Sequence, residues 1–184
     1  MRLKELGVKI TPSIANSLLL GIVTDTGCLA HKNVTPETLS AASELVALGA
    51  DLNAINYQMF KAQSEARARL FARATSSLKL YHGGQLAMIF IREADFNATG
   101  AITADTEGFI DFPLSIRGVE VAVSIMETGD KRFKISYRSK GKVNVNEVAA
   151  TFGGGGHILA SGSMLNGFFE DVVDKIVFTV GNYL

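Results

Sequence analysis

The sequence contains a single cysteine, Cys28, among its 184 residues. One cysteine cannot form an internal disulfide, and this scarcity fits a protein of the reducing cytosol. Nothing around Cys28 marks it as a nucleophile. We therefore expect a small buried side chain there rather than a catalytic thiol.

An excess of charge of either sign is also absent. Lysine and arginine together number 18, as do aspartate and glutamate, so the formal net charge is zero. A chain without a global basic field does not attract nucleic acid over its whole surface, and any anion site must be local. The longest apolar stretch near the start, residues 18–23, is too short to cross a bilayer, and the charged opening residues lack an apolar signal core. We expect a cytoplasmic protein with no membrane partner.

Several catalytic signatures are missing as well. Cysteine and histidine do not recur at zinc-site spacing, no Gly-x-Ser-x-Gly elbow occurs, and no glycine loop ends in Gly-Lys-Ser or Gly-Lys-Thr. These absences argue against structural zinc, serine-hydrolase chemistry and a Walker-type nucleotide site.

The hydrophobic pattern changes near residue 77. Before it, Thr-Pro helix starts at positions 11 and 35, a capping aspartate at position 51 and apolar residues at helical spacing predict helices. After it, strands are predicted over 78–81, 86–91, 119–125 and 133–138 as two hairpins, with helices within 104–116, over 144–151 and over 169–183. The predicted fold class is α/β, with a helical region at 1–76 and an α+β domain with a mixed, hairpin-rich sheet at 77–184.

The most unusual stretch is a run of four glycines, residues 153–156, followed by His157. Glycine permits positive φ and a close approach of the backbone to a ligand. With small residues of helix-start character within 158–162, the pattern indicates backbone N–H groups and an imidazole around a phosphate. A flexible surface loop with a solvated histidine is the alternative. Of the other histidines, we expect His82 to be solvated in a turn and His31 to lie near the turn at residue 25.

Two further segments carry candidate site residues. Asp25 follows an apolar helix in Thr-Asp-Thr-Gly, where a buried carboxylate would need a partner or a cation. A turn aspartate with local hydrogen bonds is the alternative. Arg138-Ser139-Lys140-Gly141 ends a strand, and its cations and hydroxyl suit phosphate or carboxylate, with Arg138 as the bidentate partner. A solvated strand end is the alternative there.

Together these motifs resemble the Asp-His-His (DHH) phosphoesterases. Residues 154–162, preceded by residues 138–141, look like the substrate-binding domain that accompanies them, and residues 21–27 resemble the last metal-ligand motif of their catalytic domain. The order and spacing agree across nearly the whole chain. The most similar members are bacterial oligoribonucleases that also dephosphorylate 3′-phosphoadenosine 5′-phosphate (pAp). On this resemblance, residues 1–76 are the C-terminal end of the catalytic domain and residues 77–184 the substrate-binding domain.

The resemblance implies roles at the matched positions. Asp25 would be a ligand of a manganese pair, and His157 would be catalytic beside the scissile phosphate. The substrate-binding positions would be Arg138, Ser139, Lys140, Gly154, Gly155, Gly156 and His157. The family's other metal ligands, including the Asp-His-His motif itself, would lie upstream of Met1. We therefore expect this chain not to retain the two ions and to be inactive by itself.

Other functions stay open. Within the same family, the resemblance is also compatible with a cyclic-dinucleotide or polyphosphate hydrolase. Ile158, where many members have proline, and Ala30-His31, in place of a more basic or aromatic pair, bear on substrate preference. A non-catalytic nucleic-acid-binding module is an alternative outside catalysis, and so is a domain that serves mainly to form a homodimer through exposed apolar residues near 18–23. The expected ligand is short RNA or a nucleotide.

Overall fold

A computed structural model describes residues 7, 9–30 and 32–184, which form two compact units, Met1–Gln63 and Ser64–Leu184. The sequence pattern placed a boundary after residue 76. The structure divides the chain earlier, because α5 (Glu65–Ser76) packs Leu70 and Ala74 into one cluster with Ile89 and Ile91 of the sheet. The change of hydrophobic period marks where strands begin. It does not reveal which core the preceding helix joins.

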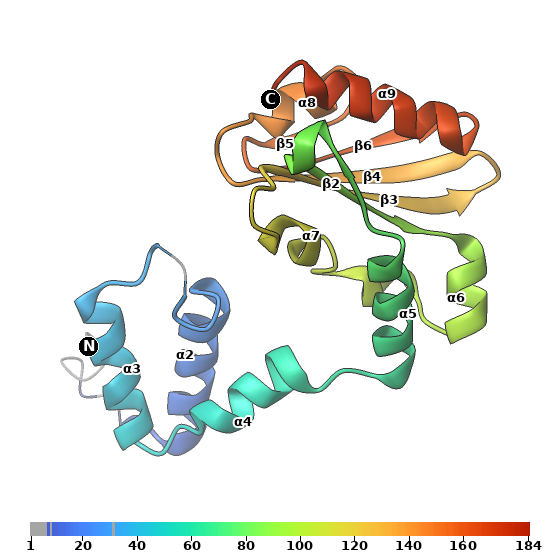
Figure 1. Ribbon diagram of the computed structural model, residues 1–184. Coiled ribbons are helices and arrows are strands. Elements are labelled where there is room, and N and C mark those ends of the chain that lie inside the picture. Colours follow the sequence, from blue (N-terminus) through green and yellow to red (C-terminus); the bar gives the residue numbers. More distant parts are fainter. Residues whose placement is uncertain (1–6, 8, 31) are drawn as a thin grey trace. The chain divides into compact units, whose positions relative to one another are not determined.

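The first unit is helical, as predicted (Figure 1). Its elements are α2 (Pro12–Asp25), α3 (Pro36–Ala47), α4 (Leu52–Asn56) and a short π-helix, η1 (Tyr57–Lys61). The Thr11 hydroxyl accepts the N–H of Ile14 at 3.4 Å, and the Asp51 carboxylate accepts that of Ala54 at 2.9 Å, so the predicted caps are present. The core of this unit consists of Ala15, Leu19, Val23, Ala42, Leu45 and Ala50, together with Ile10.

The expectation of a buried cysteine is wrong. Cys28 is exposed and lies in a turn after α2, with a φ of 59°. Its Sγ is 3.1 Å from Oδ1 of Asn56. The turn brings the side chain out of the helical core, which a residue-type preference alone does not reveal.

The second unit is built on a six-stranded sheet in the order β1-β2-β3-β4-β6-β5. β2 and β3 are parallel and the other neighbours antiparallel, so the predicted mixed sheet is confirmed. The strands are β1 (Lys79–Tyr81), β2 (Leu86–Ile91), β3 (Val121–Gly129), β4 (Arg132–Ser139), β5 (Gly155–His157) and β6 (Ala160–Asn166). β2 is buried along its whole length, which explains its uninterrupted apolar sequence.

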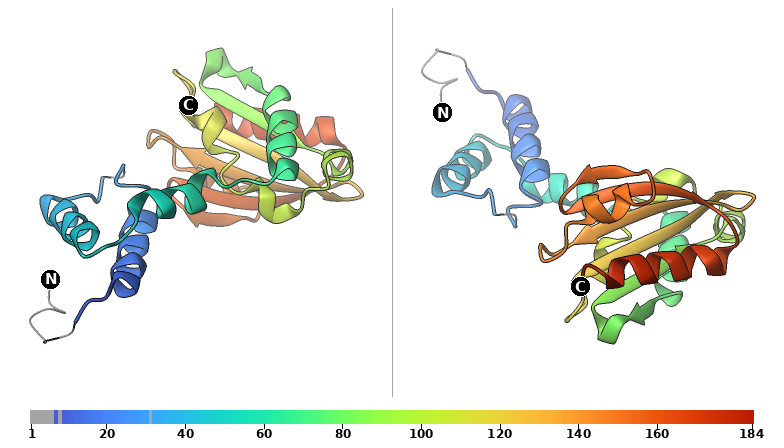
Figure 2. Two further views of the ribbon diagram at one scale, coloured as in Figure 1. Left: turned by 90° about the horizontal axis from the view of Figure 1, so that it is seen from below. Right: turned by 90° about the horizontal axis from the view of Figure 1, so that it is seen from above.

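Helices cover the two faces of the sheet unequally, as the two views of Figure 2 show. α8 (Val145–Ala150) and α9 (Phe169–Gly181) pack on one face against side chains of β2, β3 and β4. On the other face, α5 and the segment that connects β2 to β3 pack on Ile89, Ile91 and Met126. That segment contains α6 (Glu93–Thr99), the 3₁₀-helix η3 (Thr103–Thr106) and α7 (Asp111–Ser115); a second 3₁₀-helix, η2 (His82–Gly84), joins β1 to β2. No helix within the described residues is long and apolar enough to cross a membrane.

The glycine run ends one element and begins another. After α8, Gly153 takes a φ of 70°, and the N–H of Gly154 donates to the carbonyl of Ala149 at 2.9 Å, which is a left-handed helix end. β5 then forms a hairpin with β6. The helix start expected at 158–162 is therefore wrong, because these residues form a tight turn and enter a strand. A helix N-terminus does not supply anion-binding groups here.

One buried, hydrogen-bonded pair, Tyr137 and Ser163, makes the stability of the sheet depend on pH. The side chain of Tyr137 is 0% exposed, and its hydroxyl lies 3.0 Å from Oγ of Ser163. Burial raises the pKa of Tyr137 to about 12, although the hydrogen bond to Ser163 acts in the opposite direction. In the unfolded chain a tyrosine titrates near pH 10. The contribution of this residue to stability is therefore fully present below about pH 10 and is lost as the pH rises towards 12, because the unfolded state releases its proton first.

We expect Tyr137→Phe to lower the free energy of unfolding by about 1 kcal/mol at pH 7, since Ser163 loses its buried partner. Between pH 10 and 12 the difference from the unaltered protein should shrink, because phenylalanine cannot ionise. Urea unfolding at a series of pH values measures both effects. A destabilisation that stays constant from pH 7 to 12 would contradict the assigned direction of the pKa.

Candidate functional site

Half of one sheet face remains partly exposed. We call it the open face and define it by the alternate residues of β4 and β6 that point away from α8 and α9: Lys134, Ser136, Arg138, Ala160, Gly162 and Met164. The intervening residues of β4 (Phe133, Ile135 and Tyr137) belong to the core under α8 and α9. The two-residue period of a strand thus places the basic and small residues on this face together.

The strand register brings together two residues that the sequence singled out separately. His157 is opposite Ala160 on β6, and Ala160 is opposite Arg138 on β4. Residues directly opposite one another in neighbouring strands share a face. His157, Ala160 and Arg138 therefore form one row across the strands of the open face, and we say that residues of one such row lie at the same level. The side chain of His157 is exposed, whereas Arg138 is half-buried and its Nη1 donates to the carbonyl of Tyr137 at 3.0 Å.

The structure does not place Ser139 and Lys140 beside this pair. Ser139 is 6% exposed, and it points to the opposite face from Arg138; its hydroxyl accepts the N–H of Gly141 at 3.0 Å. Lys140 is exposed, and its Nζ donates to the carbonyl of Ile116 at 3.0 Å. Both side chains support the end of β4.

The glycines next to His157 allow close packing of the backbone. A Cβ at position 154 would lie 2.2 Å from the carbonyl oxygen of Gly162, and one at position 156 would lie 2.6 Å from that of Ala160. A Cβ at Gly155, by contrast, would meet only Oδ1 of Asn146, at 3.7 Å. Because the N–H of Gly154 is already bonded to Ala149, this glycine serves the hairpin that presents His157.

A pocket of about 370 Å³ extends the open face, and none of the sequence motifs indicates it. Its floor includes Ser124 of β3 with Lys134, Ser136 and Arg138 of β4, and its wall is the segment 103–110. This volume lies within the range of small-ligand pockets. The alternation of polar and apolar residues along β4 indicates that one side of this strand is polar. It does not indicate the wall of the pocket, because residues 103–110 lie about 30 positions away in the sequence.

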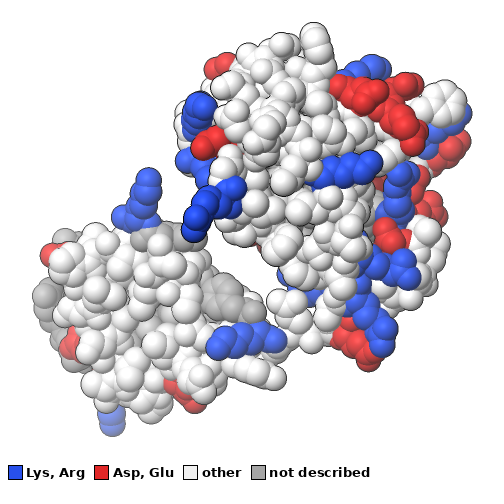
Figure 3. Space-filling model, viewed as in Figure 1, with Lys and Arg blue, Asp and Glu red and all other residues white. Residues whose placement is uncertain are grey.

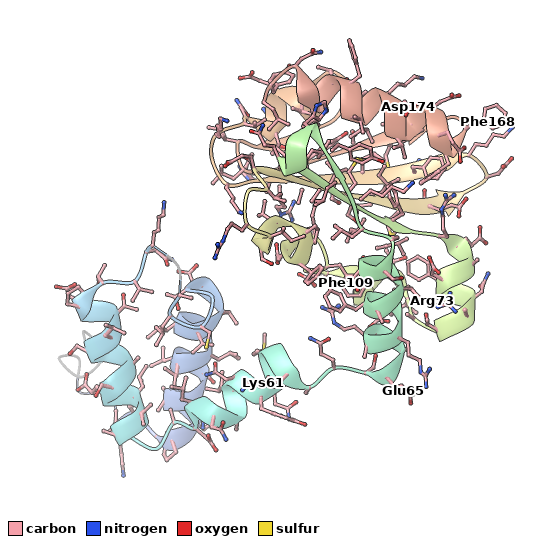
Figure 4. The ribbon with its side chains drawn as sticks, in the orientation of Figure 1. Lys61, Glu65, Arg73, Phe109, Phe168 and Asp174 are labelled. Carbon is pink, nitrogen blue, oxygen red and sulfur yellow. The ribbon has the colours of Figure 1, made fainter. Side chains whose placement is uncertain are left out.

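Arg67 of α5 holds this wall in place. Its guanidinium donates to the carbonyls of Asp105 and Glu107, the latter at 2.7 Å, and it lies 4.9 Å from the ring centroid of Phe109. Figure 4 shows Phe109 beside α5, where its ring makes an edge contact with Phe71, the centroids being 5.0 Å apart. The wall of the pocket is therefore attached to a helix rather than being a free loop.

Charge differs between the two faces of the sheet. Lys134 and Arg138 lie on the open face. Acidic side chains gather over α9 in Figure 3, where Glu170, Asp171 and Asp174 are exposed. The pocket on the open face therefore carries two cations, Lys134 and Arg138, against one carboxylate, Glu107, although the chain as a whole has no net charge.

Asp25 is not the buried carboxylate that the sequence suggested. Its side chain is exposed at the end of α2, and the Nδ2 of Asn33 donates to its carbonyl at 3.1 Å and to its Oδ2 at 3.4 Å. These local bonds match the turn alternative. Across the described residues, no three His, Cys, Asp or Glu side chains form a group that could hold a metal ion, so these residues do not by themselves fit a manganese pair.

The other two histidines contribute little here. His31 falls outside the described residues. His82 is exposed, as expected, but its Nε2 lies 2.8 Å from the carbonyl of Val177, so the ring rests on α9.

The second unit is thus a mixed-sheet α/β domain with a partly open sheet face, and comparison with known proteins shows its family. The DHHA1 domain family matches residues 83–184, and the chain belongs to this family. The resemblance inferred from the motifs is thereby confirmed. The solved structure of an exopolyphosphatase-related protein from Bacteroides fragilis has a TM-score of 0.86 and 32% identity, covering 95% of this chain and 51% of that one.

Curated relatives have related names. The bifunctional oligoribonuclease and PAP phosphatase NrnA of Thermus thermophilus is 32% identical over 166 residues, which are 90% of this chain and 49% of that protein. The cyclic-di-AMP phosphodiesterase PdeA of Listeria monocytogenes is 34% identical over 155 residues, 82% of this chain and 22% of that protein. The chain thus spans about half the length of the NrnA proteins that it matches.

Proposed function

We propose that this chain is the substrate-binding part of a manganese-dependent phosphoesterase that hydrolyses short oligoribonucleotides, pAp or both. The observation that carries the proposal is the shared level of His157 and Arg138 on the open face, at a pocket whose floor combines two serines with two cations. The names of the NrnA relatives support the substrate class.

In this proposal Arg138 binds the substrate's phosphate. A guanidinium offers several donors to phosphate oxygens, and this guanidinium is already oriented because its Nη1 donates to the carbonyl of Tyr137 on the same strand. His157 is exposed on the edge strand and approaches the same phosphate, where an imidazole can donate or accept a proton near neutral pH. Gly155 and Gly156 keep the backbone beside it free of side chains.

Hydrolysis requires more than these groups. Manganese, when bound, would supply an activated water and would neutralise charge on the phosphate. Asp25 offers one oxygen ligand, and the described residues do not complete the set. We therefore propose that the chain by itself binds nucleotide without cleaving it.

The test is to titrate the purified chain with pAp, the dinucleotide pApA and cyclic di-AMP by calorimetry, and to incubate each with manganese and analyse the products by anion-exchange chromatography. We expect pAp and pApA to bind and neither to be cleaved. Absence of binding by both linear ligands would refute the proposed site. Cleavage that disappears in Asp25→Ala would refute the claim that the chain is inactive alone, and tighter binding of cyclic di-AMP would favour a cyclic-dinucleotide hydrolase.

A further inference from the structure

We propose that Lys134 forms a second phosphate subsite, so that the open face favours oligoribonucleotides over mononucleotides. This inference rests on the proposed function, in which Arg138 holds the first phosphate. It adds a substrate preference to that site, namely for a further phosphate of an oligonucleotide bound along β4.

The spacing of β4 sets the distance between the two subsites. Lys134 and Arg138 are four residues apart on one face of one strand, and at about 3.3 Å per residue their Cα atoms are about 13 Å apart. His157 shares the level of Arg138, and Lys134 lies two levels further along the strand. A chain of nucleotides that begins at His157 and Arg138 can therefore continue along β4 towards Lys134.

The surface between the two cations is low and polar. Ser136 of β4 lies between them and is paired with Ser124 of β3 on one side and Gly162 of β6 on the other. None of these residues carries a bulky side chain, so a ribose or a phosphate can approach the strand backbone. Ser124, Ser136 and both cations line the same pocket, which makes this a continuous surface rather than two separate charges.

Lys134 is available for a ligand. Its side chain is exposed, and within the described part of the chain it makes no hydrogen bond or salt bridge. Its cross-strand neighbours are Met126 and Met164, which carry no charge. Lys140, by comparison, is already bonded to a backbone carbonyl. The Lys134 side chain is flexible and lies between two uncharged methionines, so its ammonium group can reorient towards a phosphate and bind it as a point charge.

One carboxylate opposes the two cations. Glu107 lines the pocket from the opposite wall, where Arg67 binds its backbone carbonyl. Its charge lowers the affinity for any phosphate in the pocket and does not cancel both cations. Replacement of Glu107 by glutamine should therefore strengthen oligonucleotide binding, which is the opposite effect from loss of Lys134.

The test compares Lys134→Gln with Lys175→Gln, a matched loss of one exposed lysine on α9, on the other side of the sheet. Calorimetry with pA, pApA and pApApA at several salt concentrations measures affinity against length. We expect Lys134→Gln to bind the trinucleotide about fivefold more weakly than the unaltered protein does, and we expect a smaller loss of affinity for pA. The slope of log affinity against log salt for the trinucleotide should fall by about 0.7, the value for one phosphate contact on a single strand. Lys175→Gln should match the unaltered protein at every length.

The outcomes separate this inference from the function on which it rests. If the unaltered chain binds none of the three ligands, the proposed function fails. If the chain binds them but Lys134→Gln changes neither the length dependence nor the salt slope, the second subsite is refuted and the site at Arg138 stands. An equal loss in Lys175→Gln would show that the effect is general charge, and would also refute the subsite.

Discussion

Gly154→Ala should destabilise the second compact unit by about 3 kcal/mol, although it adds only one methyl group. The new Cβ would lie 2.2 Å from the carbonyl oxygen of Gly162 and 2.6 Å from Cβ of Ser163. The nearest atom belongs to the backbone of β6, so no side-chain rotation can relieve the overlap and the hairpin must move. Urea unfolding, with hydrogen exchange of β6 amides to locate the change, measures the effect.

Gly155→Ala is the matched control. Its Cβ would meet only Oδ1 of Asn146, at 3.7 Å, which is ordinary contact. We expect a change within about 0.5 kcal/mol, since no buried group is disturbed. Equal effects of the two substitutions would contradict the close approach of β5 and β6, and would show that the glycines act through flexibility of the unfolded chain instead.

Arg138→Ala should weaken the binding of pAp and pApA by about 30-fold or more, the largest loss expected from a substitution on the open face. The reason is that the half-buried guanidinium of Arg138, across Ala160 from His157, is the bidentate phosphate partner in the proposed function, and truncation of such a partner costs about 2–5 kcal/mol. Calorimetry gives the affinity, and urea unfolding shows whether the fold is retained.

Two further variants make this result specific. Arg138→Lys retains the charge but not the planar pair of donors, so it should recover only part of the affinity. Lys140→Ala removes a cation whose Nζ bonds to the carbonyl of Ile116 and does not share the level of His157, so it should have a much smaller effect on binding than Arg138→Ala. A larger loss in Lys140→Ala than in Arg138→Ala would overturn the assignment of the phosphate to the open face.

Local sequence patterns were sufficient to predict many of the helices and strands. Hydrophobic alternation predicted β3 and β4, and the threonine and aspartate caps predicted the starts of α2, α3 and α4. These features depend on residues within a few positions of one another, and a pattern can report them. The family also followed from motifs, because several of them occur in a fixed order along the chain.

Non-local packing accounts for the predictions that were wrong or missing. The small side chains of residues 160–162 are compatible with a helix start as well as with a strand, and the pairing of β6 with β4 determines that they form a strand. Asp25 follows apolar residues in the sequence, but it lies at an exposed helix end. The wall of the pocket depends on contacts of Arg67 with residues about 40 positions away.

By itself, the sequence determined most of the helices, the strands β1 to β4, the family and the choice of the two principal candidates, Arg138 and His157. Only the tertiary structure decided that these two share one level of one sheet face, that Ser139 points away from them, and that Lys134 continues the surface. The physical reason is that alternation along a strand divides residues between two faces, whereas strand order and register decide which residues of distant segments meet on each face.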